Sequence, residues 1–201
     1  MSRRLAAALT AVALLGSGCD DDDAVEEGSG DTLTGTGYEF AIADGWEDTT
    51  SSSASVDDLE LDDPAVEALD VDGVVSATEA EGGFAPNLTI VTAPAAGQVD
   101  STAFAKANLR TAERYGTLPP GAGGGAVSFE GSVVEKTELG GEPAAYYEQV
   151  ADSPVGEARQ RQIFAIRDDT AYALTFGGLE DGQFDEYLPA VEQMLDSWRW
   201  E

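Results

Sequence analysis

The side chains that most often carry enzyme chemistry are scarce in this chain, which has one cysteine and no histidine among its 201 residues. Without histidine, neither a serine triad nor a cysteine–histidine pair can form, and a zinc site lacks its usual ligands. The 39 aspartate and glutamate residues would allow glycoside hydrolysis by a pair of carboxylates. Their spread along the chain is more typical of a charged surface. We therefore expect no catalytic residues and no enzymatic activity.

Two local patterns suggest ligands, but each has a simpler structural interpretation. The glycine-rich run 121–125 lacks the Lys-Ser/Thr ending of a phosphate-binding loop, so we interpret it as a flexible connector. An Asp-x-Asp-Gly pattern begins at Asp70 and is followed by Glu79, which matches part of a calcium-binding loop. Ala68 occupies the first ligand position, and a turn leading into a strand explains the same letters. We accordingly predict no metal site and no cofactor.

Three basic residues form a candidate contact patch. Arg159, Arg161 and Arg167 share one parity of a predicted strand, so their side chains should project from the same face of a sheet. Such a patch would attract an anion or a protein. The alternative is pairing with acidic residues such as Glu148 or Glu157. We favour pairing, because exposed ion pairs are common and contribute little energy.

The N-terminal residues follow the order of a secretory export signal. Arg3 and Arg4 give a positive start, the apolar run Leu5–Leu15 follows, and small residues at positions 16–18 precede Cys19. The apolar run has 11 residues, whereas a membrane-spanning helix needs about 20. We predict that residues 1–18 are removed as a signal peptide after export by the general secretory route. The two arginines leave a twin-arginine route as the alternative.

Cys19 is the residue for which the sequence predicts a specific modification. The segment Leu14–Cys19 resembles a lipobox, at which a diacylglyceryl group is attached to the cysteine sulfur. A lipobox usually has a large aliphatic residue three positions before the cysteine, but here Gly16 occupies that position and Leu15 lies one further back. The alternative is an unpaired thiol, which would have no disulfide partner in an oxidising compartment. We expect Cys19 to carry acyl chains such as palmitate and to anchor the protein to the outer face of the cell membrane, in the cell envelope.

The net charge excludes one large class of partners. Loss of Arg3 and Arg4 with the signal leaves eight basic residues against 39 acidic ones, a net charge of −31. A surface of this sign repels nucleic acid and anionic lipid headgroups. The expected partners are therefore the membrane, reached through the lipid on Cys19, and an envelope protein or small ligand, but not nucleic acid.

Composition divides the processed chain into a tether and one folded domain. Residues 19–37 are rich in acidic residues, glycine, serine and threonine, so they should not bury enough surface to fold. We predict an acidic flexible tether there and a domain over residues 38–201. Tyr38, Phe40 and Ile42 alternate as the apolar face of a strand does. Trp46 follows a turn and is placed to cover the core.

The remaining patterns predict an α+β domain, an antiparallel sheet flanked by helices. One helix is expected from Asp100 to Tyr115, with Asp100 or Ser101 as its N-cap. A second is expected to begin near Leu188, because Pro189 does not fit deep inside a helix. Short connections between the last strands require antiparallel neighbours. The expected strands are 38–42, 74–79, 88–92, 127–137, 144–150, 159–167 and 171–176, with a short helix over 64–69.

Six short motifs are distributed over the predicted domain. They are Tyr38-x-Phe40, Gly45-Trp46, Ala85-Pro86-Asn87, Gln162-Ile163-Phe164, Ala171-Tyr172-x-Leu174-Thr175-Phe176 and Phe184…Leu188-Pro189…Ser197-Trp198. Together they resemble the LpqN-type lipoproteins of actinobacteria, within the wider PsbP-like group. Two departures from that pattern are Ala43, where proline is expected, and a long acidic insert before Val74. The resemblance implies an α/β/α sandwich around an antiparallel sheet and a role in binding other proteins, without shared catalytic residues.

Three functional hypotheses follow. The first is a membrane-anchored, non-enzymatic binding or accessory module of the cell envelope. The second is capture of a small ligand between the sheet and a helix, which predicts a sizeable apolar pocket and is discounted by a packed sheet–helix interface. The third is a hydrolase, which requires two carboxylates converging about 5 to 10 Å apart in a cleft.

Overall fold

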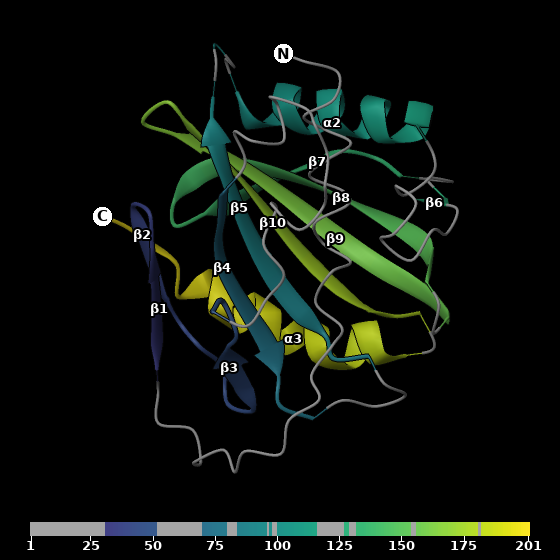
Figure 1. The fold of residues 1–201 in the computed structure, drawn as a ribbon. Helices are drawn as coiled ribbons and strands as arrows, with labels where there is room; N and C mark the ends of the chain where they lie inside the picture. Colours follow the sequence, from purple (N-terminus) through teal and green to yellow (C-terminus); the bar gives the residue numbers. More distant parts are fainter. Residues whose placement is uncertain are drawn as a thin grey trace.

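The described part of the chain is built around a large antiparallel sheet with a helix on each face (Figure 1). The computed structural model describes residues 31–51, 70–79, 84–95, 97, 100–115, 127–128, 132–153, 156–180 and 182–201. Cys19, the predicted signal peptide 1–18, the predicted helix 64–69 and the glycine-rich run 121–125 lie outside the described residues.

Eight described strands form the large sheet, in the order β3-β4-β5-β10-β9-β8-β6, and β7 also pairs with β8. All of their pairings are antiparallel, as the short connections predicted. β9 and β10 are interior strands with a neighbour on both sides. The strands are β3 (Trp46–Asp48), β4 (Asp70–Ala77), β5 (Asn87–Pro94), β6 (Val127–Ser128), β7 (Glu135–Leu139), β8 (Glu142–Ser153), β9 (Gly156–Arg167) and β10 (Thr170–Leu179).

A second, three-stranded sheet joins the two ends of the described chain. Its strand β1 (Thr32–Gly35) pairs with β2 (Tyr38–Ala41), which in turn pairs with β11 (Arg199–Trp200). The rings of Tyr38 and Trp198 are stacked, with 4.2 Å between their centroids. The C-terminal residues are therefore held against the first hairpin of the domain.

The domain begins earlier than the predicted start at Tyr38. Residues Thr32–Gly35, which we assigned to the tether, are a strand whose four residues pair with those of β2. Leu33 is the reason, because its side chain is 3% exposed and belongs to the core. A single apolar residue in a polar segment is a weak signal, and here the pairing with β2 supplies the missing stabilisation.

Two helices cover the large sheet. Helix α2 spans Ser101–Tyr115, and Asp100 caps it as predicted, since its carboxylate accepts a hydrogen bond of 2.7 Å from the amide of Ala103. Helix α3 spans Gln183–Asp196, so the predicted start near Leu188 is wrong. Pro189 lies inside α3 but on its exposed side, where water can satisfy the carbonyl that loses its helical partner.

The predicted strand 127–137 is two separate strands. β6 pairs with one end of β8, at Val150 and Ala151, whereas β7 pairs with the other end. Between these two pairings the hydroxyl of Ser132 donates a hydrogen bond to the carbonyl of Glu148. That side-chain bond occupies the acceptor to which a backbone amide would donate in a continuous ladder, so the strand is interrupted.

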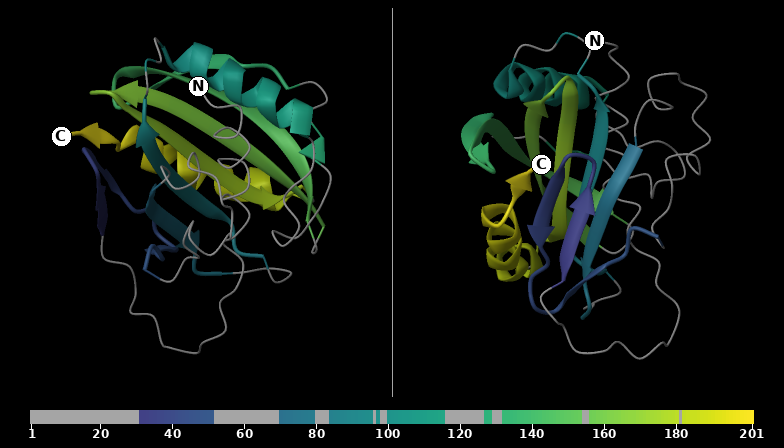
Figure 2. Two further views of the ribbon diagram at one scale, coloured as in Figure 1. Left: turned by 45° about the horizontal axis from the view of Figure 1, so that its top comes forward. Right: turned by 90° about the vertical axis from the view of Figure 1, so that its left-hand side faces the viewer.

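The two faces of the large sheet have separate apolar clusters. On one face, which we call the α3 face, the sheet packs against α3 and the small sheet; on the opposite α2 face it packs against α2 (Figure 2). Trp46 covers part of the α3 face, as predicted, and its ring lies 6.5 Å from that of Phe176. On the α2 face the ring of Phe104 meets that of Phe164 edge-on, at 5.3 Å.

Two adjacent glycines of β10 should differ sharply in their tolerance of a methyl group. A Cβ at Gly178 would lie 2.8 Å from Phe184 Cα and 3.0 Å from its nitrogen, whereas a Cβ at Gly177 would meet nothing closer than 3.8 Å. Since a helix backbone cannot yield easily, we expect Gly178→Ala to lower the free energy of unfolding by about 1–3 kcal/mol. Gly177→Ala, the matched control, should change it by less than about 1 kcal/mol. Urea denaturation measures both, and equal effects would contradict the close packing of α3.

Candidate functional site

Two of the three predicted patch arginines share one carboxylate on the α3 face. Glu148 of β8 lies directly opposite Arg161 of β9 in the strand register. Its carboxylate is 2.8 Å from Arg161 and 2.6 Å from Arg159, one oxygen for each guanidinium. The pairing with Glu148 that we favoured is thus present. A carboxylate that holds two cations is not available as a general base.

Helix α3 adds further partners to the same arginines. Asp185 lies 3.3 Å from Arg159, and Glu192 lies 3.2 Å from Arg161. Arg159 also stacks over the ring of Phe184, at 4.7 Å from its centroid. An anion or protein that bound here would have to displace these contacts, so the predicted contact patch remains a prediction.

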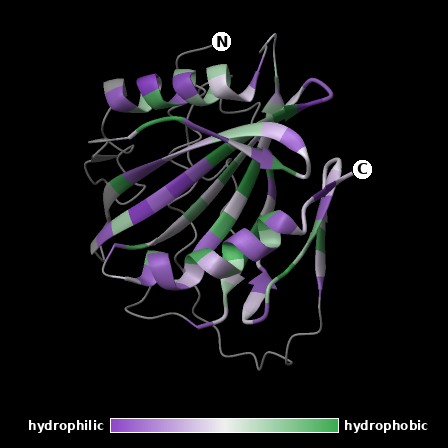
Figure 3. Ribbon diagram, turned by 180° about the vertical axis from the view of Figure 1, so that it is seen from behind, coloured by the Kyte–Doolittle hydropathy of each residue, from purple (hydrophilic) through white to green (hydrophobic). Residues whose placement is uncertain are grey.

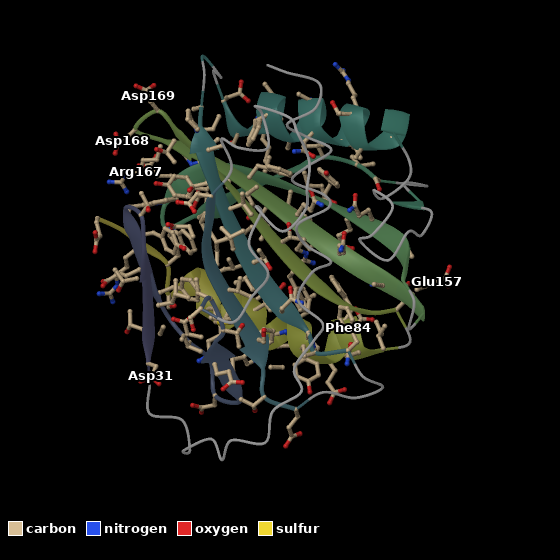
Figure 4. All side chains as sticks on the ribbon, in the orientation of Figure 1. Asp31, Phe84, Glu157, Arg167, Asp168 and Asp169 are labelled. Carbon is tan, nitrogen blue, oxygen red and sulfur yellow. The ribbon has the colours of Figure 1, made fainter. Side chains whose placement is uncertain are left out.

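Arg167 is not brought together with the other two arginines. Figure 4 shows it at the opposite end of β9 from Glu157. Its guanidinium lies 3.3 Å from Asp168, donates to the carbonyl of Glu201 and stacks over the ring of Trp200. Its contacts hold the C-terminus against the β9–β10 turn, which is a structural role.

The ionisation of Glu148 is set by these contacts. Burial alone would raise the pKa of its carboxyl, but the hydrogen bonds and positive charges of Arg159 and Arg161 outweigh burial and hold that pKa below its usual value. The pKa of Arg159 is raised, because its bond to Glu148 outweighs the effect of burial. Glu148 and Arg159 therefore stay ionised and paired at neutral pH.

The α2 face carries a feature that the sequence analysis missed, a continuous layer of buried uncharged polar side chains. These side chains come from five neighbouring strands of the large sheet and from α2. We call this set the polar layer, and it consists of Ser76, Asn87, Thr89, Asn108, Tyr147, Gln149, Gln160, Gln162 and Thr175.

The strand register places the polar layer side by side across the sheet. Gln162 of β9 lies between Tyr147 of β8 and Thr175 of β10, and Thr175 lies opposite Thr89 of β5. Gln160 lies opposite Gln149 on β8. Because strand residues alternate between faces, these amides project away from the arginines of the α3 face.

Hydrogen bonds join the layer in three groups, one of which is the bond that the hydroxyl of Thr89 donates to the side-chain oxygen of Asn87. The hydroxyl of Tyr147 lies 2.8 Å from the side-chain oxygen of Gln162 and 3.1 Å from that of Asn108 on α2. Gln149 donates to Gln160 over 2.7 Å. A phenol has one proton to donate, so one of the two amides beside Tyr147 must turn its NH₂ group toward the hydroxyl oxygen.

Four amides of the layer keep a polar atom without a hydrogen-bond partner among the described residues. These atoms are Nδ2 of Asn108, Oε1 of Gln149, Nε2 of Gln160 and Nε2 of Gln162. Buried polar atoms nearly always have a hydrogen-bond partner in folded proteins, so four such atoms without one in the same layer are unusual. Amides do not titrate, and burial raises the pKa of Tyr147, so the layer can bind but cannot transfer protons at neutral pH.

One signal in the sequence pointed to this layer. The run Arg159–Gln162 places four polar residues in succession on one strand, and Figure 3 shows a hydrophilic stretch within the sheet. A strand in the interior of a sandwich is normally apolar on both faces. The arginines of one parity carried a prediction, whereas the glutamines of the other parity carried none.

The structure also bears on the calcium-loop pattern and on the apolar pocket that the sequence suggested. Asp70 and Asp72 belong to strand β4 rather than to a loop, and Asp72 accepts two hydrogen bonds from Thr36. Within the described ranges, no three acidic or cysteine side chains gather as metal ligands would. The contact between Phe104 and Phe164 shows that the apolar part of the α2–sheet interface is packed, which discounts the apolar pocket of the second hypothesis.

Neither of the two described helices is long and apolar enough to cross a membrane.

Comparison with known proteins identifies the fold. Neither a protein-family model nor a curated protein matches the sequence. The cyanobacterial PsbP protein CyanoP of Synechocystis sp. PCC 6803 is 14% identical, with a TM-score of 0.54 over 90% of this chain and 98% of that one. At this identity the likeness establishes the fold alone. The predicted α+β, PsbP-like architecture is confirmed.

Two further solved structures are similar at lower scores. LpqN of Mycobacterium tuberculosis, described as involved in cell envelope biogenesis, is 14% identical, with a TM-score of 0.48 over 85% of this chain and 86% of that one. A protein of unknown function from Pseudomonas aeruginosa is also 14% identical, with a TM-score of 0.46 over 60% of this chain and 76% of that one.

Loss of the charge on Glu148 should destabilise the domain in a pH-dependent way. Glu148→Gln removes the closest anion of two partly buried guanidinium groups, so we expect the free energy of unfolding at neutral pH to fall by about 1–3 kcal/mol. The carboxyl has a lowered pKa in the folded state, so its contribution is present above the unfolded pKa and is lost as pH falls through the folded one. The deficit should therefore shrink in acid.

Urea denaturation at neutral and acidic pH tests this, with Glu157→Gln as the matched control. Glu157 is an exposed carboxylate on β9 itself, and its substitution should change stability by less than about 0.5 kcal/mol. A Glu148→Gln deficit that stays constant with pH would show that the ion pairs do not stabilise the fold.

Proposed function

We propose that the protein is a non-enzymatic binding module of the cell envelope, held on the outer face of the cell membrane by a lipid on Cys19. One observation carries the anchoring: the solitary cysteine follows three small residues at the end of an export signal. A processed lipoprotein has two or more acyl chains, which give stable attachment where a single chain would not. The anchor then holds the folded domain at the membrane for long periods.

The charge of the processed chain supports a position of the domain away from the membrane surface. A net charge of −31 opposes contact between the domain and anionic headgroups, at ranges up to a Debye length of about 8 Å. Residues 19–31, the part of the predicted tether 19–37 that precedes β1, carry seven of these acids, and like charges extend such a segment. The domain is thereby displayed to partners beyond the headgroup region.

Binding fits the described side chains better than catalysis does. The partly buried carboxylate of Glu148 is committed to two arginines, and the buried groups of the polar layer are amides and hydroxyls. Amides and hydroxyls recognise a partner through hydrogen bonds, whereas the hydrolase hypothesis needs two converging carboxylates with different proton affinities. We therefore rank a binding or accessory role first.

Intact mass spectrometry of the protein from a lipidating bacterium tests the anchor. We expect the wild type to lose residues 1–18, to gain acyl mass and to sediment with membranes. Cys19→Ala should show none of these changes, because the sulfur that accepts the lipid is gone. Ser17→Ala, which keeps a small residue beside the cleavage position, is the matched control and should behave as the wild type. A wild-type product without added acyl mass would overturn the proposal.

A further inference from the structure

We infer that the polar layer is a binding site for a small uncharged ligand that carries a group able both to donate and to accept hydrogen bonds, such as a carboxamide or a hydroxyl. This inference deepens the proposed binding role and rests on it, since it names the ligand class. It does not depend on the lipid at Cys19, so the two can fail separately.

The position of the layer separates it from the ordinary core. The apolar cluster on the α2 face occupies the ends of the strands nearest the β9–β10 turn, with Phe164 and Ala173 beneath Phe104 of α2. The polar layer follows on the same face, between this cluster and the buried apolar residues Ala158 and Leu179, and Asn108 marks its border with the cluster. The sheet thus changes from apolar to polar in the middle of a buried surface.

The amides are too deeply buried to form hydrogen bonds with bulk water, as exposed amides do. Gln160 is 0% exposed, Gln162 is 1% exposed and Gln149 is 3% exposed. Each still has one polar atom that no described residue satisfies. Every such atom destabilises the fold, because it has lost its hydrogen bonds to water, and apolar residues of the same shape would remove that cost. A bound group that supplies the missing partners explains why the layer is polar.

A gap in the side-chain pattern lies beside these amides. Gly177 is the layer-facing residue of β10 opposite Gln160, and it contributes no side chain. A Cβ built there would lie 3.8 Å from Gln160 Cγ and 4.0 Å from the ring of Phe84, which are ordinary contact distances. Among the described residues, the space next to the unpartnered Gln160 therefore has room for a methyl-sized group, with the Phe84 ring on one side of it.

The ligand should be uncharged because the layer contains no ionisable carboxylate or amine. On these strands Glu148 and Arg161 project from the opposite face and pair with each other. The charge of Glu113 on α2 acts on Tyr147 and is negative, so it would repel an anion. A charged ligand would be buried without a counter-ion, which is far more costly than burial of a hydrogen-bonded neutral group. The phenol of Tyr147 stays neutral, because burial raises its pKa.

The ligand should also both donate and accept. An amide side chain presents NH₂ on one side and a carbonyl on the other, and rotation by 180° exchanges them. Gln149 and Gln160 share a single hydrogen bond, so whichever way the pair is turned, one amide keeps an unpartnered NH₂ group and the other keeps an unpartnered carbonyl. A group that only accepts, such as a ketone, would leave that carbonyl unsatisfied. A carboxamide or a hydroxyl can satisfy both kinds of atom.

Ligand-observed saturation-transfer NMR tests the inference on the lipidated protein in nanodiscs. The probes are propionamide, propane-1,2-diol and propionate, which have similar size and differ in charge and hydrogen-bonding groups. We expect saturable binding of propionamide or of the diol, and the stronger of the two identifies the preferred group. Propionate should show no saturable binding. Absence of saturable binding by both neutral probes, or equal binding of propionate, would overturn the inference and leave the layer as a site for water.

Substitution then locates the bound probe. Gln149→Met with Gln160→Met keeps side-chain shape but removes both amides, and should weaken binding at least about tenfold without lowering the unfolding temperature. Gln193→Met makes the same change at an exposed amide on α3 and should have no effect. Tyr147→Phe, which deletes one atom, should weaken binding several-fold and serves if the double variant does not fold. Unchanged binding in both layer variants would place the probe elsewhere and refute the site.

Discussion

The large sheet has two faces that must both be removed from water, and two helices are the only helical cover in the described ranges. This constraint shapes the rest of the molecule. On the α3 face the cover is completed by the three-stranded sheet, which brings Tyr38 and Trp198 from opposite ends of the chain into a stack. On the α2 face the apolar cluster beneath α2 ends half-way along the strands, and polar side chains continue it.

The polar side chains of strand β9 are charged on one face of the sheet and uncharged on the other. Its arginines point toward α3 and are neutralised by Glu148 and by acids of the helix, so the charges act as cross-links within the structure. Its glutamines, Gln160 and Gln162, point the other way and are only half satisfied. A charged group cannot stay buried unless it is paired, but an amide can, at a cost that a bound ligand reverses. The polar atoms without hydrogen-bond partners on β9 therefore lie on the α2 face, where its buried polar side chains are uncharged.

Much of the fold could be predicted from local patterns because those patterns are strong. The alternation at Tyr38, Phe40 and Ile42, the Asp100 cap and the short strand connections all led to the observed elements. The predictions that failed, the start of the domain and the start of α3, concern residues whose structure depends on contacts with distant parts of the chain. Leu33 is one apolar residue in a polar segment, and Pro189 is tolerated because its side of α3 faces water.

The candidate site was less predictable than the fold. Pairing of Arg159 and Arg161 with Glu148 followed from strand parity, but the separation of Arg167 depends on the length of β9 and the position of the C-terminus. The polar layer draws on five strands and a helix, and no single segment contains its pattern. Its members become neighbours only through the strand order, which local periodicity does not specify.

The central claim is that the buried amides of the layer complete their hydrogen bonds with a bound molecule. A crystal structure of the processed protein, soaked with propionamide, at a resolution that separates water from small organic molecules, tests it most directly. The account predicts density for the amide beside Gly177, within hydrogen-bonding distance of Gln160 and either Gln149 or Gln162. Water alone at those atoms, or amides rotated so that they satisfy each other, would contradict it.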